Sequence, residues 1–196
     1  LAFYSIFYNL ACVNYDPYKV VAIIRDEYVN AAQQRIKGLD LSSSYRFDLR
    51  DGQLMVRGSV SWLDSVQATS AGQPKQTLAG TAYYPARIKG RIGAVWASGG
   101  LTASGFVNYT GGVVNTDIAT VKEKSASFTT LDATINYDMG KRADALSGLM
   151  LGLSVQNLLN RAPPLYTIPS PSFLVYDPTN YSPIGRFVSV SVSKHW

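Results

Sequence analysis

The chain has 196 residues, of which 46% are hydrophobic and 16% are charged, whereas about 25% of the residues in soluble domains are charged. No apolar run approaches the roughly 18 consecutive residues of a spanning helix, which excludes a helical membrane protein. The net charge of +5 does not indicate nucleic-acid binding, because the basic residues are scattered and form no Lys/Arg block.

The first predicted element is a strand in the opening "LAFYSIFYN". These residues have no basic leader before them and no small-residue cleavage site after them, so they do not indicate a signal peptide, and we expect the sequence to begin within a folded domain. Residues 10–37 follow as a long loop, in which Asp16 can cap a helix and Pro17 suits its first position. The apolar stripe of this predicted short amphipathic helix consists of Val20, Ile24 and Tyr28.

The next two elements alternate apolar and polar residues with a period of two. In "LDLSSSYRFDL", at 39–49, leucine and aromatic side chains share one face, and serine and charged side chains share the other. The segment "QLMVRGSVSW", at 53–62, repeats the pattern, and the Asp-Gly step between the two segments is a hairpin signal. The pattern predicts antiparallel strands with one apolar and one polar face.

Five further strands bring the predicted number to about eight, most of them near the ~9–11 residues that a tilted strand needs to cross a bilayer. They are "RIKGRIGAVWA", "LTASGFVNYT", "SFTTLDATINYD", "GLMLGLSVQN" and the terminal "GRFVSVSVSKHW". Short turns at 50–52, 98–100 and 140–147 alternate with long loops at 10–37, 65–85, 111–125 and 158–185. Short periplasmic turns and long extracellular loops are typical of outer-membrane barrels. We therefore predict an all-β fold of antiparallel transmembrane β-barrel strands.

Aromatic residues on the apolar faces support a barrel. Trp62 and Tyr109 lie next to long loops, whereas a second group lies next to short turns or the terminus. This second group consists of Phe47, Trp96, Tyr137 and Trp196. Two such belts are expected where amphipathic rings meet the two membrane interfaces. The alternative is an ordinary antiparallel sandwich that buries these aromatics.

The polar faces of a barrel line its lumen, and several charged residues fall on them. These candidate lumenal charges are Arg57, Arg87, Lys89, Arg91 and Asp132. A charge on the lipid face near the middle of the membrane costs about 2–4 kcal/mol, so we expect these residues to point inward. There they would contact a substrate or a plug inside the barrel, or they would form a cross-strand charge network.

No catalytic constellation is found. The one histidine, His195, lies at the end of the last predicted strand, and a Ser-His-Asp site would have to be built there. The sequence has no phosphate-binding loop and no Cys/His cluster for zinc, and its one cysteine, Cys12, has no partner for a disulfide. We therefore expect no enzyme, no cofactor and no metal site.

The segment "LSVQNLLNRAPPLYTIPSPSFLVYDPTNYSPIGRFVSVSVSKHW" resembles the C-terminal end of a TonB-dependent outer-membrane receptor. In that family the penultimate strand ends in V-x-N-L-F/L-N/D, a proline-containing extracellular loop follows, and YD-x-x-N-Y-x-x-x-G-R leads into the final strand. The matching residues are Val155, Asn157, Leu158, Leu159 and Asn160, then Tyr176, Asp177, Asn180, Tyr181, Gly185 and Arg186. Upstream, "RIKGLDLSSSYRF", "FVNYTGG" and "FTTLDATINY" also resemble strands of this family.

The resemblance implies a barrel of about 22 strands, of which about eight form the C-terminal third. It also implies a signal peptide and an N-terminal plug domain, and residues 1–196 contain neither, so we expect a C-terminal segment of the receptor's β-barrel domain. The implied location is the outer membrane of a Gram-negative bacterium. The implied function is import of a scarce ligand, such as a ferric siderophore, cobalamin or a saccharide. In this family TonB–ExbB–ExbD supplies the energy through the plug.

The resemblance further implies that the last strand carries a signal for the barrel-assembly machinery, with a terminal aromatic and apolar residues at alternate preceding positions. The residues assigned to this signal are Gly185, Arg186, Phe187, Val188, Val190, Val192 and Trp196. Lys194 departs from the apolar pattern, but a lysine near the interface can extend its amine to water.

The proline-containing loop supplies a candidate ligand surface, for which loop packing is the alternative. Its aromatic residues are Tyr166, Phe173, Tyr176 and Tyr181. The alternative to a transport receptor is a complete small eight-stranded outer-membrane barrel with a structural or adhesion role, since eight strands can close.

Overall fold

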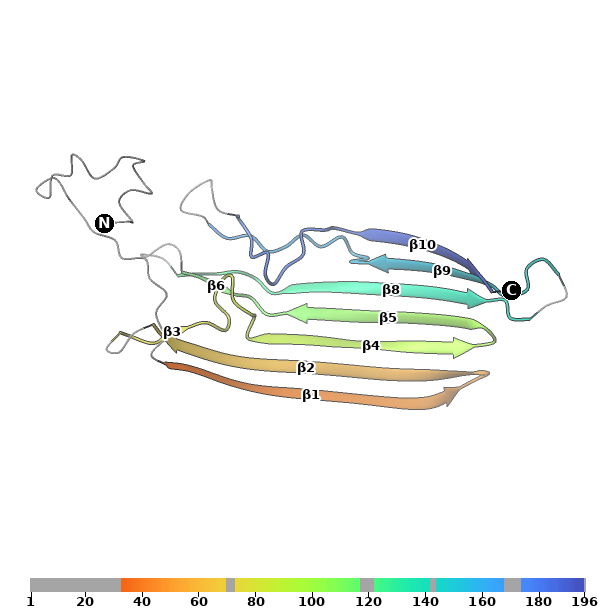
Figure 1. Ribbon diagram of the computed structural model, residues 1–196, viewed down its shortest axis with the longest axis horizontal. Coiled ribbons are helices and arrows are strands. Elements are labelled where there is room, and N and C mark those ends of the chain that lie inside the picture. The colour runs from red at the N-terminus through yellow and green to blue at the C-terminus, as the bar shows by residue number, and fades with distance from the viewer. Residues whose placement is uncertain (1–32, 70–72, 117–121, 142–143, 168–173, 196) are drawn as a thin grey trace, which may run out of the picture. The chain divides into compact units, whose positions relative to one another are not determined.

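The computed structural model describes residues 33–69, 73–116, 122–141, 144–167 and 174–195. As predicted, the fold of these residues is all-β, and antiparallel strands form one sheet in the order β1-β2-β4-β5-β8-β9-β10 (Figure 1). The long strands are β1 (Gln33–Leu49), β2 (Gly52–Ala68), β4 (Ile88–Ser98), β5 (Leu101–Thr110), β8 (Phe128–Asp138), β9 (Leu149–Gln156) and β10 (Phe187–Lys194). The short strands are β3 (Gln76–Thr77), which pairs with β2, and β6 (Val114–Asn115), which pairs with β7 (Glu123–Lys124). The first predicted strand and the predicted helix fall in residues 1–32, outside the described residues.

Among the described residues, no helix has the length and hydropathy needed to cross a membrane.

The register of the sheet separates apolar from polar residues. One unbroken row of paired residues crosses all seven long strands, and its side chains all lie on the same face. The row consists of Tyr45, Val56, Ala94, Gly105, Ala133, Val155 and Val188. This apolar face lies open to the surroundings, with 70% of Tyr45 and 54% of Val188 exposed. Such an exposed apolar face is expected of a sheet whose solvent on that side is lipid.

The predicted aromatic belts lie on this apolar face. Tyr109 pairs with Gly90 near the long connections, and Tyr137 pairs with Leu101 beside a short turn. Both rings are about two fifths exposed, at 41% each. Phe47 and Trp96 occupy apolar-face positions near the short-turn ends of their strands. Trp62 is also on the apolar face, but it lies within β2 and not at its end as predicted, because β2 continues to Ala68. Trp196 lies outside the described residues.

The sheet is open. Among the described residues, β1 and β10 lie at its two edges, and no pairing joins them. An unpaired edge exposes a row of backbone hydrogen-bonding groups, which a membrane barrel cannot leave in lipid. The described strands therefore do not by themselves form a closed barrel.

The short turns lie at one end of the sheet and the long connections lie at the other (Figure 1). The first turn differs from the prediction by one residue, because Leu49 pairs with Gly52 and only Arg50 and Asp51 remain in the loop. Arg50 takes the left-handed conformation, with a φ of +53°. In the second turn, Gly99 and Gly100 both have positive φ, at +52° and +85°, as a type I′ hairpin turn requires.

β1 and β2 are longer than predicted. Each has 17 residues, whereas the sequence pattern placed the strands at 39–49 and 53–62. Residues 33–37 continue the ladder against residues 64–68, so the loop predicted at 65–85 begins only at Thr69. The prediction was short because apolar and polar residues no longer alternate cleanly in this extension, although its backbone remains paired.

The long connections have a small core of their own. Its buried members are Ala82, Ala86, Val113, Tyr166 and Tyr181, with Phe128 packed against them. The Tyr181 hydroxyl donates to the carbonyl oxygen of Gly111 at 2.9 Å and lies 3.1 Å from the Ser125 hydroxyl. Segments that are far apart in the sequence are thus joined at one end of the sheet, where they hold the long connections together.

Candidate functional site

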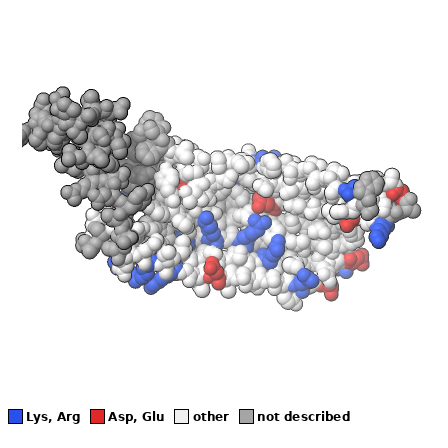
Figure 2. All heavy atoms as spheres, in the orientation of Figure 1, with Lys and Arg blue, Asp and Glu red and all other residues white. Residues whose placement is uncertain are grey.

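The polar face of the sheet carries the candidate site. Figure 2 shows that basic and acidic side chains gather over the middle of one face. The register places two adjacent rows of residues on the polar face. The first row consists of Ser44, Arg57, Gly93, Phe106 and Asp132, and the second consists of Ser42, Ser59, Arg91, Asn108 and Thr130. Five strands, β1 to β8 in sheet order, therefore each contribute one residue to each row.

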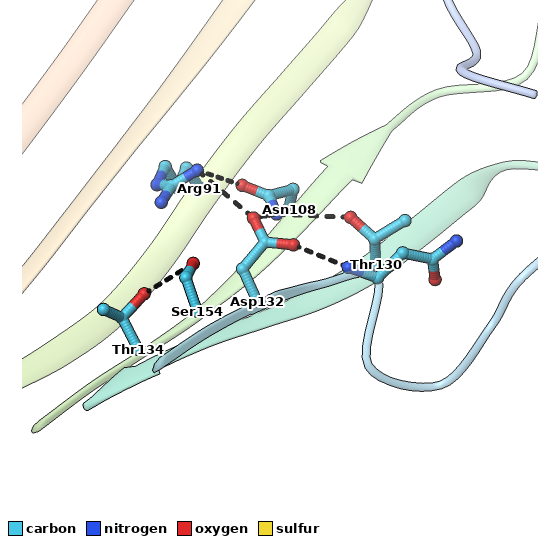
Figure 3. Close-up of polar contacts among 7 residues, drawn as sticks. Arg91, Asn108, Thr130, Asp132, Thr134 and Ser154 are labelled. Carbon is cyan, nitrogen blue, oxygen red and sulfur yellow. Dashed lines mark hydrogen bonds and ion pairs between the residues drawn. The ribbon is translucent and has the colours of Figure 1, made fainter. Parts of the chain in front are cut away.

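Arg91 is held by its neighbours in the two rows (Figure 3). Its Nη1 donates to Asn108 Oδ1 at 2.6 Å and lies 3.8 Å from Asp132 Oδ2. Asn108 then donates through Nδ2 to Asp132 Oδ2 at 2.8 Å and to Thr130 Oγ1 at 3.2 Å. The amide of Asn108 thus lies between the guanidinium and the carboxylate, and it fixes the direction in which Arg91 points.

Asp132 also connects the sheet to the segment after β9. Its Oδ1 accepts a hydrogen bond from the backbone N–H of Asn157 at 3.0 Å. Asn157 is buried and has a φ of +49°, and its side chain closes a loop onto Arg161 through two hydrogen bonds. The Asp132 carboxylate therefore links β8 to Arg91 and to the left-handed turn at Asn157.

Phe106 is an apolar residue on the polar face. Only 6% of its surface is exposed, because the ring lies over Gly93 of the neighbouring strand. A Cβ built at Gly93 would come within 2.5 Å of Phe106 Cδ1 and would also collide with the carbonyl oxygen of Gly105. Glycine at position 93 therefore leaves the space that the Phe106 ring occupies on this face.

Two guanidinium groups share this ring. The Cζ of Arg57 lies 4.8 Å from the ring centroid of Phe106, and the Cζ of Arg91 lies 4.3 Å from it. Each is within the distance at which a cation is attracted to an aromatic face. Two positively charged groups thus lie close together over Phe106. Of these two arginines, only Arg91 has a carboxylate partner in the described part of the chain.

A hollow of about 400 Å³ opens on this face beside the two arginines. Its walls include the hydroxyl-bearing Ser42, Ser44 and Ser59 as well as Arg57 and Arg91. Hydroxyl and guanidinium groups therefore line part of this hollow, beside Phe106 and Gly58. Across the described ranges, no three residues of His, Cys, Asp or Glu lie together as a metal site would require.

The structure brings together three of the five charges that the sequence singled out, namely Arg57, Arg91 and Asp132. Lys89 lies on the same face, paired in register with Ser61 and Thr110. Arg87 lies just before β4 and points to the long connections instead, where it donates to the carbonyl oxygen of Ala79 at 3.3 Å and lies 3.7 Å from Asp64.

The sequence reasoning did not identify Gly93, Phe106 or Asn108. The turn at Gly99 and Gly100 could have identified Asn108 and Phe106, because a two-residue turn fixes the pairing of its strands. Counting back from it places Asn108 opposite Arg91 and Phe106 opposite Gly93.

A comparison with known proteins agrees with this architecture. The family model described as "TonB dependent receptor-like, beta-barrel" matches residues 2–158. The chain belongs to this family. Members of this receptor family are transporters of the Gram-negative outer membrane and not enzymes. The match ends at Leu158, so the "YDPTNYSPIGR" segment that carried much of the resemblance lies beyond it.

Neither the curated proteins nor the solved structures contain a significant match to this receptor barrel.

The structure places the strand predicted to carry the assembly signal at an edge of the receptor's sheet. In β10, Val188, Val190 and Val192 lie on the apolar face with 54–74% of each side chain exposed, and Phe187 lies on the opposite face. Lys194 shares the face of the valines, and its Nζ donates to the carbonyl oxygen of Ala145 at 2.8 Å. Just before the strand, the N–H of Arg186 donates to Asn160 Oδ1 at 2.8 Å, and Gly185 lies against the same oxygen. The signal itself stays a prediction.

The aromatic residues of the candidate ligand loop are in different environments. Tyr166 and Tyr181 are buried, at 5% and 1% exposure, in the small core of the long connections. Tyr176 is half-buried, and Phe173 lies outside the described residues. Burial raises the pKa of the Tyr181 hydroxyl, the Ser125 hydrogen bond opposes this rise, and the nearby Asp177 carboxylate adds to it. A ligand contact by this loop stays a prediction, and the two buried rings serve its packing.

Proposed function

We propose that the chain forms part of the barrel wall of a receptor that imports a scarce ligand across the outer membrane with TonB-derived energy. The observation that carries this proposal is the division of the sheet into an open apolar face and a charged face with a ligand-sized hollow, within the TonB-dependent receptor family. The wall supplies the polar lining of the import path. Energy comes from TonB–ExbB–ExbD acting through a plug domain, and the barrel-assembly machinery recognises the final strand.

We propose further that the described strands are the C-terminal segment of a longer barrel. The open sheet supports this, because β1 and β10 need partners before the apolar face can contact lipid without exposed edges. The proposed ligand is a scarce nutrient whose import requires energy, namely a ferric siderophore, cobalamin or a saccharide.

The test is made in the native host. An antibody against residues 174–195 is used on the outer-membrane fraction, and a band several times heavier than 21.3 kDa is expected. A band at 21.3 kDa in that fraction would indicate that the chain closes by itself as a small barrel, and it would contradict the proposal.

Transport is tested separately by growth on limiting iron, cobalamin or oligosaccharide. Deleting the gene and deleting TonB should abolish growth on the same nutrient. If deleting the gene has no effect on any of the three while the protein is abundant in the outer membrane, the import proposal is wrong.

A further inference from the structure

We propose that three of the long connections form one rigid rim, whose parts do not move apart when a ligand enters the receptor. The rim lies at one end of the sheet (Figure 1). Its first connection is residues 73–87, its second is residues 111–116 and 122–127, and its third is residues 157–167 and 174–186. The statement about ligand entry rests on the proposed transport function, whereas the rigidity of the rim does not.

The first and second connections are joined through their backbones. The N–H of Ala82 donates to the carbonyl oxygen of Val114 at 2.9 Å, and the N–H of Val114 donates to the carbonyl oxygen of Gly80 at 2.8 Å. Together these bonds form a parallel bridge between Thr81 and Val114. Thr81 is itself held, because its hydroxyl donates to the carbonyl oxygen of Thr77 at 2.9 Å. The two connections therefore share a short piece of sheet.

The third connection is tied to the first by the side chain of Asn180. Its Nδ2 donates to the carbonyl oxygen of Tyr84 at 2.6 Å, and its Oδ1 accepts a hydrogen bond from the N–H of Ala86 at 2.9 Å. The amide thus pairs with two backbone groups as a neighbouring strand would. Its Nδ2 also donates to Oδ2 of the fully buried Asp177 at 2.7 Å. Because Ala86 is buried too, removing the amide would leave a buried N–H without its acceptor.

The third connection is also tied to the second, at two places. One is the Tyr181 hydroxyl, through the hydrogen bonds described above. The other is the backbone of Thr167, whose N–H donates to Glu123 Oε2 at 2.7 Å and whose carbonyl oxygen accepts from Asn115 Nδ2 at 3.0 Å. Every pair of connections is therefore joined directly. One connection can leave the rim only by breaking bonds to both of the others.

The small core of the long connections strengthens this arrangement, because all three connections contribute buried residues to it. The first supplies Ala82 and Ala86, the second supplies Val113, and the third supplies Tyr166 and Tyr181. Segments that open easily have few buried apolar contacts and solvent-exposed backbone hydrogen bonds, and the described parts of the rim have neither property. We therefore expect the three connections to open as one cooperative unit.

This rigidity bears on how a ligand enters. A lid closes over a ligand by moving relative to the rest of its site, and such elements are drawn from the least stable parts of a protein. The three connections are joined in every pair, so a ligand passes them while they keep their mutual arrangement.

The first test is hydrogen exchange of the full receptor in lipid nanodiscs, followed by mass spectrometry. Asn180→Ala removes two hydrogen bonds to the first connection and leaves those of Tyr181 and Thr167 in place. Exchange should become about tenfold faster in all three connections. The decisive segment is residues 111–116, because the Asn180 side chain has no hydrogen bond to it among the described residues.

The matched control is Ser182→Ala in the same connection. Ser182 is exposed, and its hydroxyl accepts a hydrogen bond from the nearby N–H of Ile184. Exchange in this variant should change by less than about twofold. Faster exchange in Asn180→Ala that is confined to the first and third connections would show that the connections open separately, and would overturn the rigid rim. An Asn180→Ala variant that exchanges like the control would overturn it as well.

The second test locks the rim covalently and measures import. Tyr84→Cys and Thr179→Cys place thiols at exposed positions beside the Asn180 contact, in a Cys12→Ser background, and a short bismaleimide joins them. Cells with the cross-linked receptor should import the growth-limiting nutrient as fast as cells treated with a single-headed maleimide. Loss of import only after cross-linking would overturn the rigid rim. A receptor that supports no import before cross-linking would count against the transport function, and the exchange experiment would still decide whether the rim is rigid.

Discussion

Removing the carboxylate of Asp132 should destabilise the barrel wall more than removing any other acidic group of the polar face. The change is Asp132→Ala. Asp132 accepts hydrogen bonds from Asn108 at 2.8 Å and from the N–H of Asn157 at 3.0 Å, and it lies 3.8 Å from Arg91. Its side chain is 25% exposed, so water can replace part of what is lost.

The magnitude follows from these contacts. A hydrogen bond to a charged group contributes about 1.5–3 kcal/mol net, and a partly exposed ion pair contributes about 0–1 kcal/mol. Two such hydrogen bonds at the lower end of their range and the ion pair give about 3–4 kcal/mol, and water offsets part of this, so Asp132→Ala should lower the free energy of unfolding by about 2–4 kcal/mol. Asn157 accounts for part of this loss, because its backbone N–H is left without an acceptor while the residue is buried.

The assay is urea unfolding of the full receptor in lipid vesicles, followed by tryptophan fluorescence. Asp40→Ala is the control, because Asp40 lies on the same face, is exposed, and its side chain has no hydrogen bond or ion pair within the described ranges. It should change the free energy of unfolding by less than about 0.5 kcal/mol. If the two variants have the same stability, the network around Asp132 contributes nothing to the free energy of unfolding, which contradicts the expected loss.

Three further outcomes are expected. Gly93→Ala should lower the free energy of unfolding by about 1–3 kcal/mol in the same assay, because the new Cβ collides with Phe106 and the Gly105 carbonyl. Gly90→Ala should be tolerated, because the nearest atom to its new Cβ is 3.5 Å away. Equal effects of the two variants would contradict the close packing at Gly93. Tyr181→Phe should cost about 1–2 kcal/mol through the lost hydrogen bonds to Gly111 and Ser125, and a variant as stable as wild type would show that these bonds add nothing. The pKa of Tyr181 in the folded protein is raised above its usual value of 10.0, so the unfolded chain loses this proton first as the pH rises. The contribution of Tyr181 to stability should therefore be fully present below pH 10 and decrease above it. In an alkaline unfolding series, Tyr181→Phe should lack this decrease.

The sequence predicted most of the fold because alternation and turn chemistry are local. The double-glycine turn fixes how β4 pairs with β5, and this register alone places Asn108 opposite Arg91. The turn predicted at 50–52 is one residue longer than the loop at Arg50 and Asp51, so the register of β1 against β2, with Ser44 opposite Arg57, was not predicted. The strand ends were predicted less well, because the extension of β1 and β2 is held by backbone pairing and not by an apolar pattern.

The rest of the site depends on contacts across long connections. The pairing of β2 with β4 and of β5 with β8 brings Arg57 and Asp132 onto the same row, and no turn rule gives the register across a long loop. The burial of Tyr166 and Tyr181 depends on the same connections, since their core is assembled from segments that are distant in the sequence. The presence of aromatic residues in the 158–185 loop alone did not show whether these rings form a ligand surface or pack inside the loop.

The division of the sheet into a lipid face and an aqueous face is tested by measuring which face meets lipid. Nitroxide labels are attached to single cysteines in a Cys12→Ser background of the full receptor in its native membrane. On β5, Val107→Cys is compared with Ser104→Cys, and on β8, Ile135→Cys is compared with Asn136→Cys. We expect oxygen to reach the labels at 107 and 135 more readily, and a water-soluble nickel chelate to reach those at 104 and 136 more readily. Equal accessibility at all four positions, or the reverse order, would contradict a wall with lipid on one face and an aqueous import path on the other.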